Sequence, residues 1–125
     1  MGKIFDFVCF IATLVNNDEY SNKIIVLLPN QKHPDHYHKL KDESFYILNG
    51  ELEIVVNKSE KRVLKTGDLL RIPRMTLHSF STTTGCIFEE ISTTHHNNDS
   101  YYLDMNISNS ERDSRKTYVS NWVIL

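Results

Sequence analysis

Residues 36 to 50 read His-Tyr-His-Lys-Leu-Lys-Asp-Glu-Ser-Phe-Tyr-Ile-Leu-Asn-Gly and contain three side chains that commonly bind metal ions. His36 and His38 lie two residues apart, so on an extended strand their side chains project from the same face and can hold one ion. Glu43 follows in the same stretch, and His78 offers a third imidazole. Imidazoles combined with a carboxylate suit a divalent first-row metal, and Zn, Mn, Fe, Ni and Co all stay open.

The length and the charge of the chain limit the classes of protein it can belong to. With 125 residues it can fold as one domain around its own core, so a metal is not needed for folding and is expected to serve function. The 14 Lys and Arg residues and the 16 Asp and Glu residues give a net charge of -2, without a long basic run. This balance argues against nucleic acid or an anionic membrane surface as the main partner.

Two further features favour a cytoplasmic protein. Cys9 and Cys86 are far apart in apolar surroundings, which is typical of reduced, buried thiols, although a single disulfide stays open as the alternative. Residues 4–15 are apolar, but Asp6 interrupts them, no signal-peptide cleavage site follows, and the run is too short to cross a bilayer. We therefore expect residues 4–15 to lie in the core or in an interface.

Short apolar segments at even spacing, separated by Gly, Pro and Asn, predict an all-β fold, either a small antiparallel barrel or a sandwich. The expected strands cover residues 10–15, 24–28, the stretch around His36 and His38, 43–48, 52–56, 62–65, 69–72, 77–80 and 86–92. Asn49-Gly50 is typical of a two-residue hairpin turn, so we expect the chain to reverse there. Whether residues 1–9 form a strand or a helix stays open.

The last twenty residues change in character. Residues 106–117 are rich in Ser, Asn and charge, so we expect them to add little to the core and to be mobile. Residues 118–125 are apolar again and contain Trp122. Such a segment usually docks on its own barrel or on a partner chain, and we expect a homodimer.

The spacing of the candidate ligands resembles the two signature motifs of the cupin superfamily. The matching pattern is His36-x-His38, four residues, Glu43, six residues, Gly50, and then Gly67, five residues, Pro73, four residues, His78. The resemblance implies one cupin domain over residues 1–125, a jelly-roll β-barrel (double-stranded β-helix) with motif 1 at 36–50 and motif 2 at 67–78. It also implies one divalent transition metal per chain, held by His36, His38, Glu43 and His78.

The second motif departs from the pattern at one position. Met75 stands where cupins usually carry Gly after Pro73. We expect this turn to adopt an ordinary backbone shape instead of the one glycine permits, with a slight displacement of His78.

Three stretches resemble sugar-handling cupins, in particular the D-lyxose isomerase-like group and the cupin modules of sialic acid synthases. Two of them, residues 15–20 and 89–95, lie outside the metal motifs, and the third is the run of residues 36–43 with Phe45-Tyr46, inside the first motif. The resemblance implies an aldose–ketose isomerase or an epimerase acting on a sugar. A non-catalytic sugar-binding or regulatory module is the alternative, and an iron-dependent dioxygenase is a third, less favoured class.

Isomerisation requires a base that moves a proton between C1 and C2, and a carboxylate is a reasonable choice. Glu89 and Glu90 are neighbours on a predicted strand, so at most one of them faces the interior. We predict that Glu90 faces inward and is the catalytic residue, because the Glu-Ile-Ser run at this place resembles the isomerase-like cupins. A surface pair of carboxylates without a role is the competing interpretation.

Two residues are candidate substrate-binding groups. Lys41 could donate to a sugar hydroxyl or phosphate, although a solvated loop lysine is the favoured state. Tyr46 alternates with Phe45 on the strand after Glu43, so we expect one of the two to line the cavity, although core packing would account for either equally well. We expect Arg71 to be exposed on its strand. His95 and His96 precede a loop-like Asn-Asn-Asp run, so we expect both to be exposed or at the rim of the pocket.

Overall fold

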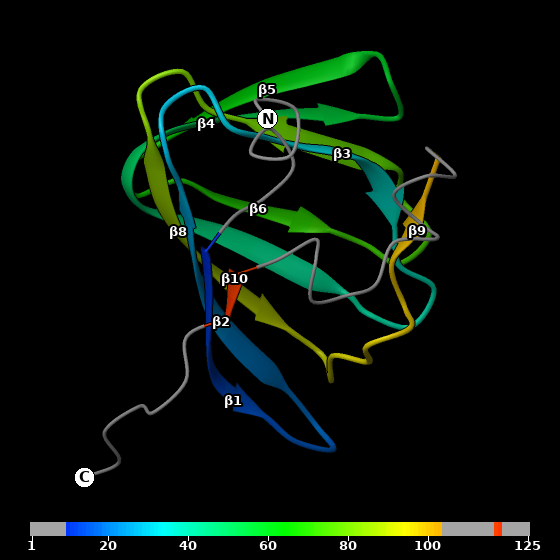
Figure 1. The fold of residues 1–125 in the computed structure, drawn as a ribbon. Coiled ribbons are helices and arrows are strands. Elements are labelled where there is room, and N and C mark those ends of the chain that lie inside the picture. The colour runs from blue at the N-terminus through cyan, green and yellow to red at the C-terminus, as the bar shows by residue number, and fades with distance from the viewer. Residues whose placement is uncertain (1–9, 104–116, 119–125) are drawn as a thin grey trace, which may run out of the picture.

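A computed structural model describes residues 10–103 and 117–118, and within these ranges the chain forms strands and no helix (Figure 1). The strands are β1 (Phe10–Asn16), β2 (Ser21–Leu27), β3 (Lys32–Tyr37), β4 (Glu43–Val56), β5 (Glu60–Lys65), β6 (Leu69–Ile72), β7 (His78–Ser81), β8 (Cys86–Ser92), β9 (Tyr101–Tyr102) and β10 (Thr117–Tyr118). The predicted ranges of β6 and β8 are confirmed. The two short strands β9 and β10 were not predicted, because neither has a strand-like apolar pattern.

The strands form two layers that share β4. The order β10-β1-β2-β8-β4 makes one layer, in which β6 also pairs with β4. The order β4-β7-β3-β9 makes the other, in which β5 pairs with β4. Among the described strands, every pairing is antiparallel except that of β1 with β10. The prediction of an all-β antiparallel barrel is therefore confirmed.

The expected hairpin turn at Asn49-Gly50 is wrong, because β4 runs through both residues without reversing. Its register against β8 shifts between Ile47 and Asn49, and the strand then passes from one layer to the other. Gly50 has a φ of 91°, and a Cβ at this position would lie 2.3 Å from the carbonyl oxygen of Gly85. The glycine thus serves a close backbone approach at a bulge and not a turn.

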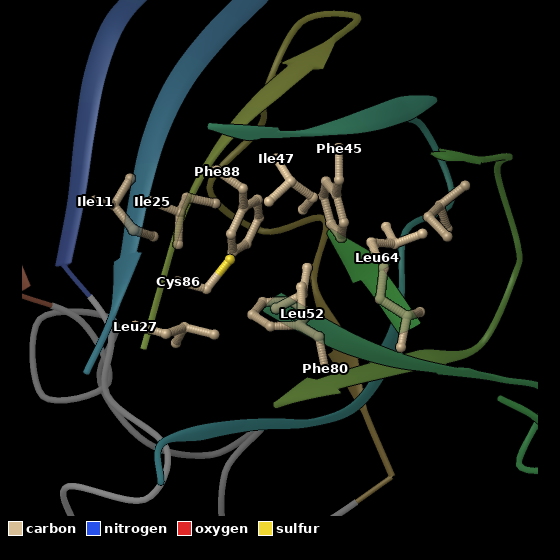
Figure 2. Close-up of a cluster of buried hydrophobic side chains, with 12 residues drawn as sticks. Ile11, Ile25, Leu27, Phe45, Ile47, Leu52, Leu64, Phe80, Cys86 and Phe88 are labelled. Carbon is tan, nitrogen blue, oxygen red and sulfur yellow. The ribbon is translucent and has the colours of Figure 1, made fainter. Parts of the chain in front are cut away.

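The apolar core fills one half of the space between the layers (Figure 2). Phe45, Phe80 and Phe88 meet there at tilted or edge-to-face angles, with ring centroids 5.0 to 5.7 Å apart. Burying each such side chain contributes roughly 1.5–3 kcal/mol. Cys86 is a free thiol in this cluster, and burial raises its pKa to about 11. Cys9 lies outside the described residues.

The other half of the interior is polar, although it belongs to the same strands. On β2, the inward side chains are apolar at Ile25 and Leu27 and polar at Ser21 and Lys23. On β8, they are apolar at Phe88 and polar at Glu90 and Ser92. Because β2 and β8 pair antiparallel with Lys23 opposite Glu90, these polar positions fall at one end of the barrel. That end holds the candidate site.

The predictions for residues 1–9, for most of the polar tail (106–116) and for residues 119–125 lie outside the described ranges. Within those ranges we find no helix with the length and apolar character that crossing a membrane requires.

Candidate metal centre

The structure brings the four predicted ligands together at the polar end of the barrel. His36 lies near the end of β3, His38 directly follows that strand, and Glu43 and His78 begin β4 and β7. Pairing of β3 with β7 sets His36 opposite His78. One ligand atom from each of the four buried residues lies within 4.8 Å of the others.

Each imidazole is oriented by a backbone carbonyl group. The Nδ1 atoms of His36, His38 and His78 lie 2.9 Å from the carbonyl oxygens of Pro34, Asp99 and Thr76, respectively. A carbonyl oxygen can only accept, so each Nδ1 carries the proton and each Nε2 is left with a lone pair. Such second contacts hold metal-binding histidines in the required tautomer and ring orientation.

The centre of the cluster contains acceptors that face one another. Nε2 of His78 lies 3.1 Å from Oε1 of Glu43, and Nε2 of His38 lies 3.5 Å from the same oxygen. Within the described part of the chain, neither His78 Nε2 nor Glu43 Oε1 has a hydrogen-bond partner, although both atoms are buried. Two acceptors at this distance repel unless a cation lies between them. The donor set therefore fits a divalent transition metal.

Burial and neighbouring charges keep these side chains in the forms that bind metal. Burial lowers the pKa of His36 well below its usual value, and the three neighbouring imidazoles lower it further. Burial alone would raise the pKa of Glu43, but the charge of Lys41 holds it well below its usual range. A neutral imidazole and an ionised carboxylate are the states that a metal requires.

The expected ordinary backbone at Met75 is wrong. Its φ is 65°, in the left-handed region that favours glycine, and its side chain is exposed. The backbone N–H of Met75 donates to the carbonyl of His38 over 2.7 Å, which joins the two motifs. The turn thus keeps the glycine-like shape without glycine, and His78 stays in the cluster.

The expectation of a solvated Lys41 is also wrong, since only 3% of this residue is exposed. Its Nζ lies 3.3 Å from Oε2 of Glu43 and 3.2 Å from Oε2 of Glu90. Burial alone would lower the pKa of Lys41, but the two carboxylates outweigh that effect and raise it above its ordinary value. Lys41 is therefore a buried ammonium that bridges the ligand cluster to Glu90.

The structure separates the two neighbouring glutamates as predicted. Glu90 is 6% exposed and faces the interior. Glu89 faces outward, where its carboxylate accepts a hydrogen bond of 3.1 Å from the side-chain amide of Asn22. Because neighbouring side chains on a strand alternate between its faces, only Glu90 of this pair of glutamates can contribute to the site.

Tyr46 does not reach the cavity. It is 38% exposed on the outer face of β4, whereas Phe45 points inward and lines the pocket. The prediction that Tyr46 binds substrate is therefore wrong, because Phe45 and not Tyr46 is the aromatic residue that reaches the cavity. Arg71 is exposed, as expected, and pairs with Asp42 over 2.6 Å.

The two histidines after β8 differ from each other. His96 is exposed, as expected. The expectation is wrong for His95, which is buried with its Nδ1 3.4 Å from Nζ of Lys41. The fold thus adds His95 to the surroundings of the site without adding it to the ligand cluster.

A cavity of about 30 Å³ adjoins the ligands and reaches Lys41 and Glu90. This volume accommodates about two water molecules. Its wall includes two residues that sequence reasoning missed, His33 and Tyr102, whose hydroxyl oxygen lies 3.1 Å from His33 Nε2. An additional histidine three residues before His36 was the only local signal, and nothing in the sequence pointed to Tyr102.

Comparison with known proteins agrees with this architecture. The family model described as Cupin domain matches residues 23–91, which is more than half of the chain. The chain belongs to the cupin domain family. A comparison with curated proteins gave no match.

Solved structures with the same fold include L-ribose isomerase from Cellulomonas parahominis with L-ribose, at a TM-score of 0.75 and 14% identity over 85% of this chain and 75% of that one. KdgF from Halomonas sp. has a TM-score of 0.63 and 17% identity over 69% and 78% of the two chains. A cupin-2 domain containing protein from Shewanella frigidimarina has a TM-score of 0.57 and 21% identity over 65% and 76%. At these identities the similarity shows the fold alone.

Proposed function

We propose that this cupin binds one divalent transition metal per chain and interconverts an aldose with its ketose, or epimerises a related sugar. The observation that carries the proposal is Glu90, a buried carboxylate that shares a small cavity with the ligand cluster and is joined to it through Lys41. The similarity in fold to an L-ribose isomerase supports a sugar as the substrate class.

The ligand cluster and Glu90 would divide the chemistry. A divalent ion held by the four side chains would supply Lewis-acid polarisation of the sugar carbonyl. Glu90 would accept the proton from C2 of the aldose, the C–H electron pair would form the C1–C2 double bond, and the carbonyl pair would move to O1, which takes up a proton to give an enediol. The O2 hydroxyl would then lose its proton as the C2 carbonyl forms, and the electron pair of the double bond would take the proton from Glu90 at C1, which gives the ketose. The net result is the transfer of one proton from C2 to C1 and of one proton from O2 to O1.

Lys41 would hold Glu90 in place and donate to the substrate. Its ammonium lies between the carboxylates of Glu43 and Glu90, so the side chain of Glu90 has a defined position next to the ligands. An ammonium has three donors: two serve the carboxylates, and the third, which lies 3.4 Å from Nδ1 of His95, would turn to a sugar hydroxyl or phosphate oxygen.

The size of the cavity indicates how a sugar would enter. A volume of about 30 Å³ admits only a few atoms, so the reacting C1 and C2 end of an open-chain sugar would lie against Glu90 and the remainder would extend outward. This arrangement suits a reaction confined to two adjacent carbons at the end of the substrate.

The test is turnover of a broad panel of aldoses, ketoses and sugar phosphates by protein reloaded separately with each of the five metals. Glu90→Gln is expected to lower kcat by about 10²- to 10⁴-fold, the usual contribution of a general base. Glu89→Gln is the matched control and should retain activity, because this carboxylate faces outward. Absence of turnover with every sugar and metal would rule out the isomerase.

A non-catalytic sugar-binding module is the second candidate, and the ion pair between Lys41 and Glu90 favours it, because a carboxylate held by a buried ammonium can be purely structural. A binding module would be stabilised thermally by its sugar to the same extent in the wild type and in Glu90→Gln. Oxygen consumption with ferrous iron would instead support a dioxygenase.

A further inference from the structure

Residues 93–103 follow β8 and lie beyond the region that the family model matches, residues 23–91. We call them the 93–103 segment. At its start, the backbone N–H of Thr93 donates to the carbonyl of Asp42, and Thr93 Oγ1 accepts from the backbone N–H of Asp42, both over 3.0 Å. At its end, β9 pairs with β3 (Figure 1), and the register of this pair sets Tyr102 opposite His36. The segment is thus tied to both sides of the loop that joins His38 to Glu43.

Asp99 is the central contact of this segment with that loop. Its Oδ1 accepts from the backbone N–H groups of Lys39 and Leu40 over 2.9 and 3.0 Å. Its Oδ2 accepts from those of Leu40 and Lys41 over 3.3 and 3.0 Å. Three successive N–H groups that converge on one carboxylate form an anion-binding nest, and Asp99 occupies it with only 2% of its surface exposed.

The same residue also orients a ligand. The backbone carbonyl of Asp99 accepts from Nδ1 of His38 over 2.9 Å, which directs His38 Nε2 toward the cluster. Asp99 therefore holds His38 on one side of the loop and the backbone of Lys41 on the other. Because the carboxylate anchors the peptide whose carbonyl meets His38, loss of the carboxylate contacts should also loosen that carbonyl.

We propose that Asp99 is a positioning residue of the metal centre, acting through the nest at residues 39–41 and through His38. The inference rests on metal binding in the proposed function but does not depend on isomerisation. Partners of this kind usually change metal affinity by about 10- to 100-fold when they are removed.

The test is the metal dissociation constant of Asp99→Asn, measured by chelator competition with Zn²⁺ and by titration with Co²⁺. Both oxygens of Asp99 accept hydrogen bonds, so the amide would set an N–H₂ group against backbone donors. We expect the dissociation constant to rise by about 10- to 100-fold and the visible absorption of bound Co²⁺ to change. A constant within about threefold of the wild type, with an unchanged Co²⁺ spectrum, would overturn the proposal.

Asp68→Asn is the matched control. Asp68 also accepts a backbone N–H, that of Lys65 over 2.8 Å, but in an exposed turn outside the ligand cluster. Its substitution should leave metal affinity and the Co²⁺ spectrum unchanged, because it perturbs a turn without touching a ligand. An equal loss of affinity in both variants would show a general effect of turn stability and would contradict the role of Asp99.

A second measurement uses the unaltered protein, in case Asp99→Asn does not fold. Hydrogen exchange at the amides of residues 39–41 should slow when Zn²⁺ is added, because the metal fixes His38 and thereby the carbonyl and carboxylate of Asp99. Unchanged exchange at these amides would overturn the coupling. If the protein binds metal in this way but turns over no sugar, the proposed isomerase is contradicted and the role of Asp99 is not. If the protein has no affinity for metal, both proposals are contradicted.

Discussion

Nζ of Lys41 lies 3.2 Å from Oε2 of Glu90, and both groups are buried although 49 residues separate them in the sequence. The same Nζ lies 3.3 Å from the metal-ligand candidate Glu43. One ammonium thus balances two carboxylates in the interior of a small barrel. This contact links the ligand cluster to the proposed base.

Replacing Lys41 by Met should strongly destabilise the protein without metal. The substitution keeps the length of the side chain but removes the ammonium that lies 3.3 and 3.2 Å from the carboxylates of Glu43 and Glu90, and breaking such a buried pair costs about 3–5 kcal/mol. The measurement is the free energy of unfolding in urea with a chelator present. Lys61→Met is the control, because the Lys61–Glu53 pair is exposed and such pairs contribute about 0.2–1 kcal/mol. Equal losses in the two variants would contradict the role of Lys41.

Metal should stabilise the folded chain by an amount that rises with the logarithm of its free concentration once that concentration exceeds Kd. At a free Zn²⁺ or Mn²⁺ concentration of 100 Kd we expect about 2.7 kcal/mol of added stability, which raises the melting temperature. Chelation should reverse the effect. His78→Ala should abolish it, since His78 is a fully buried member of the cluster, whereas His96→Ala should retain it because His96 is exposed. A metal-induced shift that survives His78→Ala would place the metal elsewhere.

The stability of the metal-free protein should fall as the pH falls below the ordinary histidine pKa of 6.5. Burial and three neighbouring imidazoles hold the pKa of His36 well below that value, so the unfolded chain takes up this proton before the folded chain does. Protonation of Glu43 acts in the same direction at lower pH, because its folded pKa is also depressed.

Urea unfolding with a chelator present, at several pH values from 8 to 5, measures this dependence. His36→Asn should show a shallower loss than the wild type over this range. Constant or rising stability toward pH 5 in the wild type would contradict the expected buried, neutral His36.

Met75→Gly should stabilise the protein. A residue with a side chain in the left-handed region lowers the stability of the fold by about 1–2 kcal/mol, and glycine removes this strain. Glycine also raises the conformational entropy of the unfolded chain, which offsets part of the effect, so we expect a net gain in stability of about 0.5–1 kcal/mol. Thermal melting measures the gain. Leu69→Gly is the control, since Leu69 is also exposed but its φ is not positive. This substitution should lower the stability of the protein. A loss of stability in Met75→Gly would mean that the side chain has a contact that compensates the strain.

The homodimer stays a prediction. We expect its interface on the outer face of the layer formed by β1, β2, β8, β4 and β6. Exposed apolar side chains on this face include Phe10, Leu14, Leu28, Leu48, Leu69, Ile87 and Ile91. Ile91→Glu should convert a dimer to a monomer in light scattering after size exclusion, because a buried charge opposes association. Val63→Glu, at an exposed position in the other layer, should leave the mass unchanged. A monomeric wild type would refute the prediction.

Local spacing was sufficient to predict the all-β fold class, the shared face of His36 and His38 and the opposite faces of Glu89 and Glu90. The reason is that strand geometry repeats every two residues, so His36 and His38 share a face and Glu89 and Glu90 do not. The bounds of β6 and β8 followed from short apolar runs between turn residues for the same reason. The four-residue ligand set and the choice of Glu90 came from the resemblance to cupins.

The partners of these residues depended on the tertiary structure. Asn49-Gly50 has the composition of a hairpin turn, yet the approach of Gly85 makes it the bend of one continuous strand. Lys41 and Asp99 lie in segments of loop composition and are buried, because partners distant in the chain meet them there. The carboxylate of Glu90 meets Lys41 from 49 residues away, and the backbone N–H groups of residues 39–41 meet Asp99 from 58 to 60 residues away. The short-range pattern of residues thus determines which atoms can bind a metal, while contacts distant in sequence decide what surrounds them, because those contacts form only when the two layers close.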